Sequence, residues 1–207
     1  QAVANAATLR RIMPAAPLSR RHALTLMAAF AAAPVCAETT RPPQWATPVA
    51  APGVPNLFRV TPRIYRSAQP DSEGFQSLQA MGIKTVINLR RRIDDTPLTE
   101  GTGLTTLHIK IKTRNVTENH GAAIVLALRA LRDEQRNGPV LVHCTHGADR
   151  TGMIIALWRM LYQDWPRADA ITEMRQGGYG FHEVWANIPR YLEQVDLAAL
   201  KSQVAVG

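Results

Sequence analysis

The stretch VLVHCTHGADRTG, residues 140–152, constrains the fold more than any other part of the chain. Its β-branched beginning predicts a buried strand that ends at His143, and the apolar residues that follow Arg150 predict a helix. Cys144 therefore stands where a strand ends and a glycine-containing loop leads into a helix. Ligands of α/β proteins bind at this edge of the sheet.

The rest of the body alternates between strand and helix patterns. Predicted strands cover residues 57–60, 64–67, 83–89, 104–111 and 139–143. Predicted helices cover residues 71–81, 118–136, 150–162, 166–176 and 184–197. Asp71 suits an N-cap, Gly82 the position after a helix, and Pro166 the first helical position. With no repeat or linker inside it, the body is predicted to be one α/β domain, with a central four- or five-stranded sheet flanked by helices.

The first forty residues have a different character. LSRRHALTLMAAFAAAPVCAETT, residues 18–40, joins two arginines, an apolar run and small residues in the order of a secretory signal. We expect residues 1–37 to be a leader and cleavable signal peptide, residues 38–56 a proline-rich extended lead-in, and residues 57–207 the folded domain. This predicts a periplasmic or otherwise exported protein, by the Sec or twin-arginine route. The apolar run is too short to span a bilayer stably, so no membrane span is expected after cleavage.

Removal of that leader changes the charge and the cysteine content. The chain carries a net charge of +8, and the leader holds four arginines and no acid, so the remainder carries +4. This mild charge indicates no nucleic-acid partner. Cys36 would leave with the leader, and Cys144 would then have no partner for an intramolecular disulfide.

Cys144 has three readings: nucleophile, metal ligand or inert buried thiol. A metal site would need His143, Cys144 and His146, but neighbours on a strand point to opposite faces. An inert thiol does not account for Gly147 and Arg150 nearby. We therefore favour the nucleophile and expect no metal and no cofactor.

Residues 145–149 form a loop that leads into a helix N-terminus, and such a loop is a cradle for anions. Its backbone N–H groups and the positive end of the helix dipole face the same point. Gly147 allows the chain to turn closely, and the fork of Arg150 matches two phosphate oxygens. The same field stabilises a thiolate, which predicts a nucleophilic Cys144 beside a bound phosphate.

Together with IYRSAQPDSEGFQSLQAMGIKTVINLR and GGYGFHEVWANIPRYL, this loop resembles that of bacterial, exported, dual-specificity-type phosphatases among the cysteine-dependent protein tyrosine phosphatases. The resemblance implies a tyrosine phosphatase-like catalytic domain with its phosphate-binding loop between a strand and a helix. It also implies attack by Cys144 on phosphorus and a cysteinyl-phosphate intermediate. The implied phosphate-binding residues, besides Arg150, are Thr145, His146, Gly147, Ala148 and Thr151. Thr151 is further expected to donate a hydrogen bond to the thiolate.

The general acid is not fixed by the resemblance. The family usually carries an Asp on a loop upstream of the cysteine, and TRNVTENHG, residues 113–121, has none. Candidates are Asp149, Glu118, and Asp95 with its neighbour Asp94. We place Asp149 first, because the myotubularin-like branch also has an Asp before its arginine.

Basic residues follow two of the predicted strands, at 90–92 and at 110–114. Parallel strands would bring them to the edge that holds Cys144, where they favour polyanionic substrates. We expect a phosphomonoester hydrolase for phosphotyrosine or other aryl phosphates, acting on phosphorylated protein or a small anionic phosphate ester. Two alternatives are an inositol polyphosphate or phosphoinositide phosphatase, and a phosphate-binding pseudophosphatase without an efficient acid.

Overall fold

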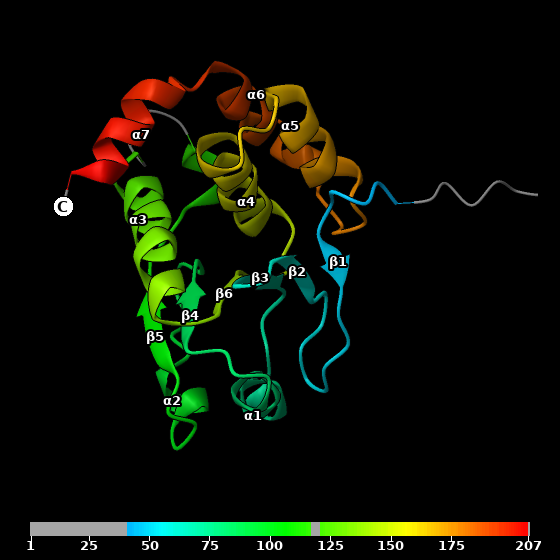
Figure 1. The fold of residues 1–207 in the computed structure, drawn as a ribbon, viewed down its shortest axis with the longest axis vertical. Coiled ribbons are helices and arrows are strands. Elements are labelled where there is room, and N and C mark those ends of the chain that lie inside the picture. Colours follow the sequence, from blue (N-terminus) through cyan, green and yellow to red (C-terminus); the bar gives the residue numbers. More distant parts are fainter. Residues whose placement is uncertain (1–40, 117–120, 207) are drawn as a thin grey trace, which may run out of the picture. The chain divides into compact units, whose positions relative to one another are not determined.

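The structure is a computed structural model that describes residues 41–116 and 121–206. The described residues form a mixed six-stranded sheet with the strand order β1-β2-β3-β6-β4-β5 (Figure 1). The strands are β1 (Thr47–Pro48), β2 (Phe58–Thr61), β3 (Ile64–Ser67), β4 (Thr85–Asn88), β5 (Thr105–His108) and β6 (Val140–His143). The α/β prediction is confirmed, and the strand beyond the predicted four or five is β1, which lies in the proline-rich lead-in.

Helices cover both faces of this sheet. They are α1 (Ser72–Ala80), α2 (Thr96–Thr99), α3 (Gly121–Asn137), α4 (Asp149–Tyr162), α5 (Arg167–Gln176), α6 (Asn187–Gln194) and α7 (Leu197–Ala205), with the 3-10 turns η1 (Thr113–Asn115) and η3 (Glu183–Trp185). Figure 1 shows α1 on one side of the sheet and α3 to α7 on the other. Side chains alternate accordingly, because Val140 and Val142 belong to the core beneath α4, whereas Leu141 packs with Phe75 of α1.

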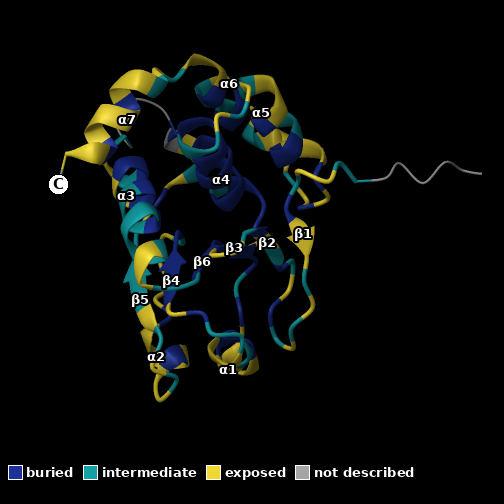
Figure 2. Cartoon of the chain, in the orientation of Figure 1, coloured by how far each residue is buried: buried dark blue, intermediate teal, exposed yellow. Residues whose placement is uncertain are grey.

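Helix α4 is the centre of the larger core. Apolar residues surround its axis, and Figure 2 shows it buried over nearly its whole length. A helix that is apolar all round must be enclosed on all sides, here by the sheet and by α3, α5, α6 and α7. The helix that receives the loop after Cys144 is therefore firmly fixed in the fold.

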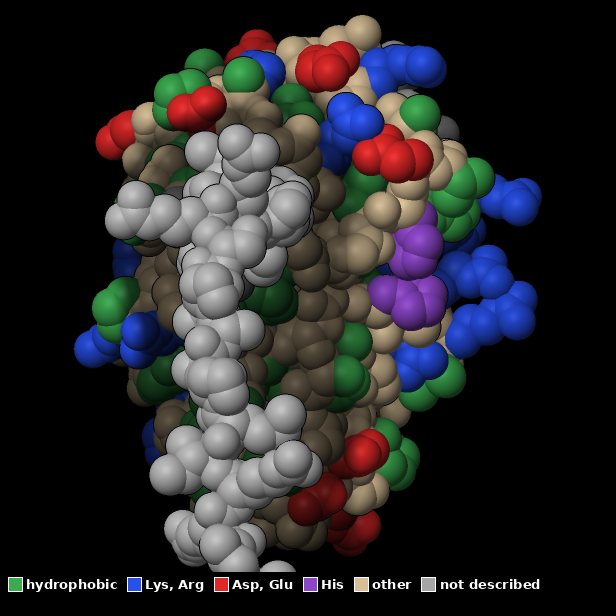
Figure 3. Space-filling model, turned by 90° about the vertical axis from the view of Figure 1, so that its right-hand side faces the viewer, with side chains coloured by type: hydrophobic (Ala, Val, Ile, Leu, Met, Phe, Trp, Pro, Cys, Tyr) green, Lys and Arg blue, Asp and Glu red, His purple; other side chains and the backbone are tan. Residues whose placement is uncertain are grey.

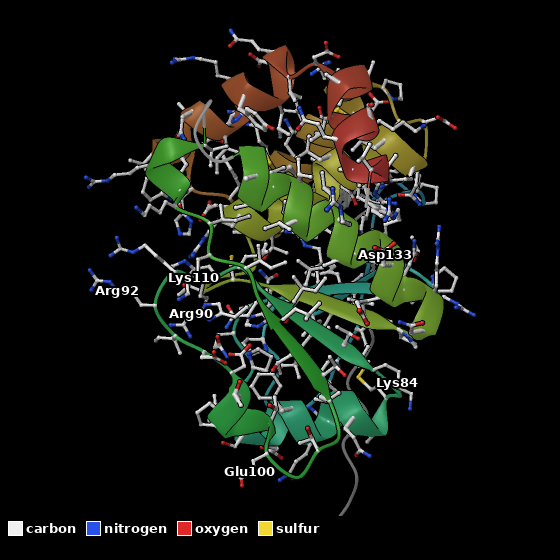
Figure 4. All side chains as sticks on the ribbon, turned by 90° about the vertical axis from the view of Figure 1, so that its left-hand side faces the viewer. Lys84, Arg90, Arg92, Glu100, Lys110 and Asp133 are labelled. Carbon is white, nitrogen blue, oxygen red and sulfur yellow. The ribbon has the colours of Figure 1, made fainter. Side chains whose placement is uncertain are left out.

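Four neighbouring strands run parallel and bring their carboxyl ends to one edge. His143 at the end of β6 is in register with Ser67 of β3 and with Asn88 of β4, and Asn88 is in register with His108 of β5. In Figure 4, Arg90, Arg92 and Lys110 accordingly lie together at one end of the sheet, and Lys84 lies at the other. The expected meeting of the two basic segments with the Cys144 edge is confirmed.

Two of the predicted helices differ from the structure. The expected helix 184–197 is interrupted at Val195 and Asp196, where the backbone is extended, and Asp196 then caps α7 by accepting the N–H of Ala199 at 2.9 Å. Pro166 is the N-cap of α5 rather than its first helical residue, because its ψ of 139° is not helical.

The N-terminal predictions concern mostly residues outside the described part of the chain. The expected leader, 1–37, lies wholly outside it, as does the candidate acid Glu118. From residue 41 on, the lead-in packs on the domain, with Ala46 and Val54 buried. None of the described helices has the length and apolar character needed to cross a bilayer.

Candidate active site

The loop after β6 turns sharply around Gly147. Cys144 is 1% exposed, and the chain enters α4 at Asp149. Gly147 has a φ of +71°, and a Cβ there would lie 2.5 Å from the carbonyl carbon and oxygen of Ser67. Only glycine meets both demands, so the predicted role of Gly147 as the turning residue is confirmed.

Strand β3 and the residues after it support this loop from behind. The Arg66 guanidinium donates to the carbonyl oxygen of Gly147 at 2.6 Å, and the backbone N–H of Gln69 donates to that of Thr145 at 3.2 Å. Both contacts engage carbonyl oxygens of the loop, as is expected of a loop whose N–H groups bind an anion. The predicted bracing by the segment that contains Arg66 and Gln69 is confirmed.

Arg66 places a buried positive charge close to Cys144. Its guanidinium lies 3.6 Å from the centre of the Tyr179 ring. Burial lowers the pKa of Arg66, while Tyr179, Glu173 and Cys144 oppose this shift. Burial also raises the pKa of Tyr179 to about 12, so the phenol stays neutral beneath the guanidinium. Guanidinium groups keep their proton in proteins, so Arg66 adds a positive charge beside the thiol.

Two nitrogens of the Arg150 guanidinium are hydrogen-bonded within the described part of the protein, and the third is not. It donates to the carbonyl oxygen of Leu89 at 3.2 Å and to the Thr145 hydroxyl at 3.1 Å. Its Nε is buried and has no hydrogen-bond partner among the described residues. A buried donor without a partner calls for a ligand, and an oxyanion is the acceptor that a guanidinium fork fits best.

Arg150 also lines a cavity of about 520 Å³. The lining residues are Arg91, Ile111, Lys112, Thr113, Arg114, Arg150 and Trp185. Four of these side chains are cationic, and the described residues that line the cavity include no carboxylate. Such a cavity concentrates anions next to the loop that starts at Cys144.

Asp95 lies beneath the loop, in a buried pair with His143. The His143 Nε2 is 2.6 Å from the Asp95 carboxylate, and both side chains are 0% exposed. Gln69 donates to the same carboxylate at 2.9 Å and accepts from Arg90 at 2.7 Å. Asp95, one of the candidate acids, is thus enclosed by two partners, whereas its neighbour Asp94 is exposed, bonds to Thr96 and faces His108.

Asp149, the first of the candidate acids, lies in the first turn of α4. Its carboxylate accepts the backbone N–H of His182 at 3.0 Å and faces the His182 ring nitrogen at 2.9 Å.

Among the other residues predicted to bind phosphate, Ala148 is buried, whereas His146 is exposed and Thr145 half-buried. Thr151 is buried, and its hydroxyl has no hydrogen-bond partner among the described residues, so the expected hydrogen bond to the Cys144 sulfur is not formed in this structure.

Three contributions were not predicted from the sequence. They are the pairing of Asp95 with His143, the contact of His182 with Asp149, and the position of Trp185 in the cavity wall. One signal was available, because a histidine within the apolar strand VLVH must find a polar partner once the strand is buried. The segment 177–182 was expected only to brace the loop or to frame the pocket.

A cysteine at the start of a strand-to-helix phosphate cradle, with an arginine six residues later, defines the class of cysteine-dependent phosphatases. A sequence model of the tyrosine phosphatase family matches residues 54–196. The chain belongs to this family.

Individual relatives agree with this assignment. The dual specificity protein phosphatase TpbA of Pseudomonas aeruginosa is 34% identical over 168 residues, which cover 81% of this chain and 74% of that protein. A crystal structure of P. aeruginosa TpbA in complex with pTyr matches with a TM-score of 0.72 and 33% identity, over 81% of this chain and all of that chain. The chain is thus a cysteine-dependent phosphatase of the tyrosine or dual-specificity type.

More distant relatives carry other names. Inositol diphosphatase DSP5 of Arabidopsis thaliana is 29% identical, over 71% of this chain and 72% of that protein. The catalytic core of the PP-IP phosphatase SIW14 from S. cerevisiae, in complex with citrate, matches with a TM-score of 0.61 and 25% identity, over 72% of this chain and 90% of that chain.

Proposed function

We propose that this phosphatase hydrolyses phosphotyrosine and other aryl phosphate monoesters through a covalent phosphoenzyme. The observation that carries the proposal is the loop that starts at Cys144 and ends at Arg150, whose guanidinium has a buried donor without a partner. The similarity to TpbA, whose structure in complex with pTyr is known, supports the same substrate class.

The chemistry follows from the order of these groups. The Cys144 sulfur attacks phosphorus, the S–P bond forms, and the P–O bond to the alcohol breaks. The alcohol oxygen leaves with a proton from the general acid. A water oxygen then attacks phosphorus and gives a proton to the general acid, which is now deprotonated, the S–P bond breaks, and phosphate and the thiolate are released. The loop N–H groups and Arg150 stabilise the charge on the equatorial oxygens during both steps.

The substrate class is tested with three esters: para-nitrophenyl phosphate, a phosphotyrosyl peptide and the matching phosphoseryl peptide. We expect release of phosphate from the first two, with kcat/KM at least tenfold higher for the phosphotyrosyl than for the phosphoseryl peptide. Cys144→Ser should abolish release from all three. Saturable phosphate binding without turnover would contradict the proposal and favour the pseudophosphatase.

For the general acid we propose Asp149, with Glu118 as its rival, and we assign Asp95 a positioning role because it is enclosed by His143 and Gln69. A poor leaving group needs the acid more than a good one does. The acid's variant, Asp149→Asn or Glu118→Gln, should therefore lose about 10²-fold on an alkyl phosphate and less on para-nitrophenyl phosphate. Equal losses on both esters would contradict the role of the residue tested.

A second candidate function rests on the cationic cavity. Four positive side chains exceed what one phosphate group requires, and the similarity to the inositol diphosphatase and the PP-IP phosphatase supports an inositol polyphosphate or phosphoinositide as substrate. Lys112→Gln and Arg114→Gln should then lower kcat/KM more for inositol polyphosphates than for para-nitrophenyl phosphate. The matched control is Arg92→Gln, because Arg92 is exposed and outside the cavity lining. Parallel losses on both substrates would exclude this function.

We also propose export, on the basis of the pattern in residues 18–40 alone. The test is expression of the full chain with a C-terminal epitope in a bacterium, followed by fractionation. Export predicts a shortened protein in the periplasmic fraction whose N-terminus is Glu38. Replacement of both Arg20 and Arg21 by lysine would block the twin-arginine route and leave the Sec route working. Retention of the uncleaved chain in the cytoplasm would contradict export.

A further inference from the structure

Three side chains with metal-binding chemistry meet at the rim of the phosphate loop. His146 comes from the loop, Asp149 from the first turn of α4, and His182 from the segment between α5 and η3. One ligand atom of each lies within 4.8 Å of the other two. The rings of His146 and His182 are 4.9 Å apart, and Figure 3 shows two histidine side chains next to each other beside a group of Lys and Arg side chains.

Besides the contact of the His182 ring nitrogen with Asp149 at 2.9 Å, the fold brings these side chains together through contacts that leave the ring nitrogens of the histidines free. The backbone N–H of His182 donates to one oxygen of Asp149 at 3.0 Å. The Asn56 amide donates to the carbonyl oxygens of both His146 and Tyr179, at 2.8 and 2.9 Å. The loop and the segment that carries His182 are therefore fixed side by side, and the Asp149 carboxylate is held in one orientation, as ligating carboxylates are in metal sites.

The Asp149 carboxylate supplies the negative charge that a cation needs at this place. The Asp149 side chain is only 8% exposed, and its ion-pair partner within the described part of the chain is His182 rather than an arginine or lysine. A carboxylate that is nearly buried and faces a histidine has acceptor capacity left for a metal ion. Both histidine rings reach solvent, since His146 is exposed and the His182 side chain is 44% exposed, so an ion can enter.

Two imidazoles and one carboxylate are the donor set that a zinc ion accepts, with Zn–N and Zn–O distances of about 2.0 to 2.2 Å and an open fourth position. A tetrahedral site then needs its donor atoms about 3.4 Å apart. The Asp149 and His182 atoms are already 2.9 Å apart, and rotation of the exposed His146 ring can shorten the remaining distances.

We propose that His146, Asp149 and His182 form a binding site for a zinc ion at the rim of the phosphate loop. The site includes neither Cys144 nor His143, but it includes Asp149, the proposed general acid, so a bound zinc ion would prevent Asp149 from donating its proton and would inhibit turnover. A bound ion would tie the phosphate loop and the first turn of α4 to the segment that carries His182. The proposal does not depend on the proposed substrate, because binding is measured without turnover.

The test is calorimetric titration of the full chain, without a polyhistidine tag and stripped of metal by a chelator, with zinc chloride. We expect one equivalent to bind to the wild-type protein. Asp149→Asn and His182→Ala should each weaken this binding at least tenfold. His108→Ala is the matched control, because the His108 ring faces a single carboxylate, that of Asp94, at 3.4 Å. This variant should bind zinc as the wild type does.

The Cys144 thiolate is the rival zinc ligand, and Cys144→Ser separates the two. Retention of one equivalent by Cys144→Ser supports the proposed site. Loss of zinc binding in Cys144→Ser, together with intact binding in His182→Ala, would overturn the proposal. The absence of stoichiometric zinc binding to the wild type would overturn it as well. Thermal unfolding without metal shows whether each variant is folded, and His182→Ala should be folded because the ring that it removes is 44% exposed to solvent. Added zinc should then raise the Tm of the wild type and leave the Tm of His182→Ala unchanged.

Discussion

Two histidine–carboxylate pairs flank the phosphate loop, and they differ mainly in burial. His143 and Asp95 lie 2.6 Å apart beneath the loop, and neither side chain is exposed. His182 and Asp149 lie 2.9 Å apart at its rim, with 44% of the histidine side chain exposed. The chemistry of the two pairs is the same, but solvent and ligands can reach only the second.

The difference shows that burial decides whether a histidine–carboxylate pair stabilises the fold or is able to bind a ligand. The buried pair continues through Gln69 to Arg90 and so ties the end of β6 to the segments that follow β3 and β4. The rim pair has no such continuation among the hydrogen bonds of the described residues, and its open side faces His146. We therefore expect stability to depend on the first pair and ligand binding on the second.

Removal of a partner from the buried pair should give the largest effect on stability. Asp95→Ala leaves His143 buried without its carboxylate and should lower the free energy of unfolding by about 3 kcal/mol, because an uncompensated buried group is costly. Equilibrium unfolding in urea at neutral pH measures this loss. The neighbouring exposed carboxylate provides the control, Asp94→Ala. A loss below about 1 kcal/mol for Asp95→Ala would mean that the buried pair is not the support described here.

The rim pair should contribute less. A double-mutant cycle with Asp149→Ala and His182→Ala, in the presence of a chelator, should give a coupling free energy of about 0.5 to 1 kcal/mol, because solvent screens the pair. Added salt should reduce the coupling further. A coupling free energy as large as the loss in unfolding free energy of Asp95→Ala would show that burial is not the property that separates the two pairs.

Asp94 extends the comparison to a carboxylate that is exposed to solvent. Hydrogen bonds from the backbone N–H and hydroxyl of Thr96 lower the pKa of Asp94, with a smaller contribution from His108. The ionised carboxylate therefore stabilises the fold above the ordinary Asp pKa of about 3.9, and this contribution is lost as the pH falls through the lowered pKa.

Because the Asp94 side chain is 54% exposed, Asp94→Asn should cost no more than about 0.5 kcal/mol at neutral pH. The measurement is urea unfolding of both proteins at neutral pH and at the acid end of their stability range. The difference between them should shrink in acid. A difference that grows in acid would show that the sign of this linkage is wrong.

The parts that could be predicted from the sequence are those specified locally. The β-branched residues before Cys144 and the apolar residues after Arg150 define β6 and α4 by themselves. Gly147 is similarly recognisable, because a tight turn toward a phosphate needs a residue that tolerates positive φ. The edge of the sheet that holds the site follows from the parallel order of such strands.

The parts that could not be predicted depend on partners distant in the sequence. Asp149 and His182 are 33 residues apart, and Asp95 and His143 are 48 apart, so only tertiary packing pairs them. Strand β1 has two residues, including Pro48, and forms because β2 offers an edge, not because its residues favour a strand. The break before α7 did carry a local signal, since Asp196 is a suitable N-cap.

The central claim is that Cys144 takes the phosphoryl group from the substrate. Rapid quenching of the enzyme during turnover of a radiolabelled phosphotyrosyl peptide, followed by peptide mapping, tests it most directly. We predict label in the peptide that contains Cys144, and none in the Cys144→Ser protein. Turnover with no labelled protein, or label that maps to another residue and persists in Cys144→Ser, would contradict the account.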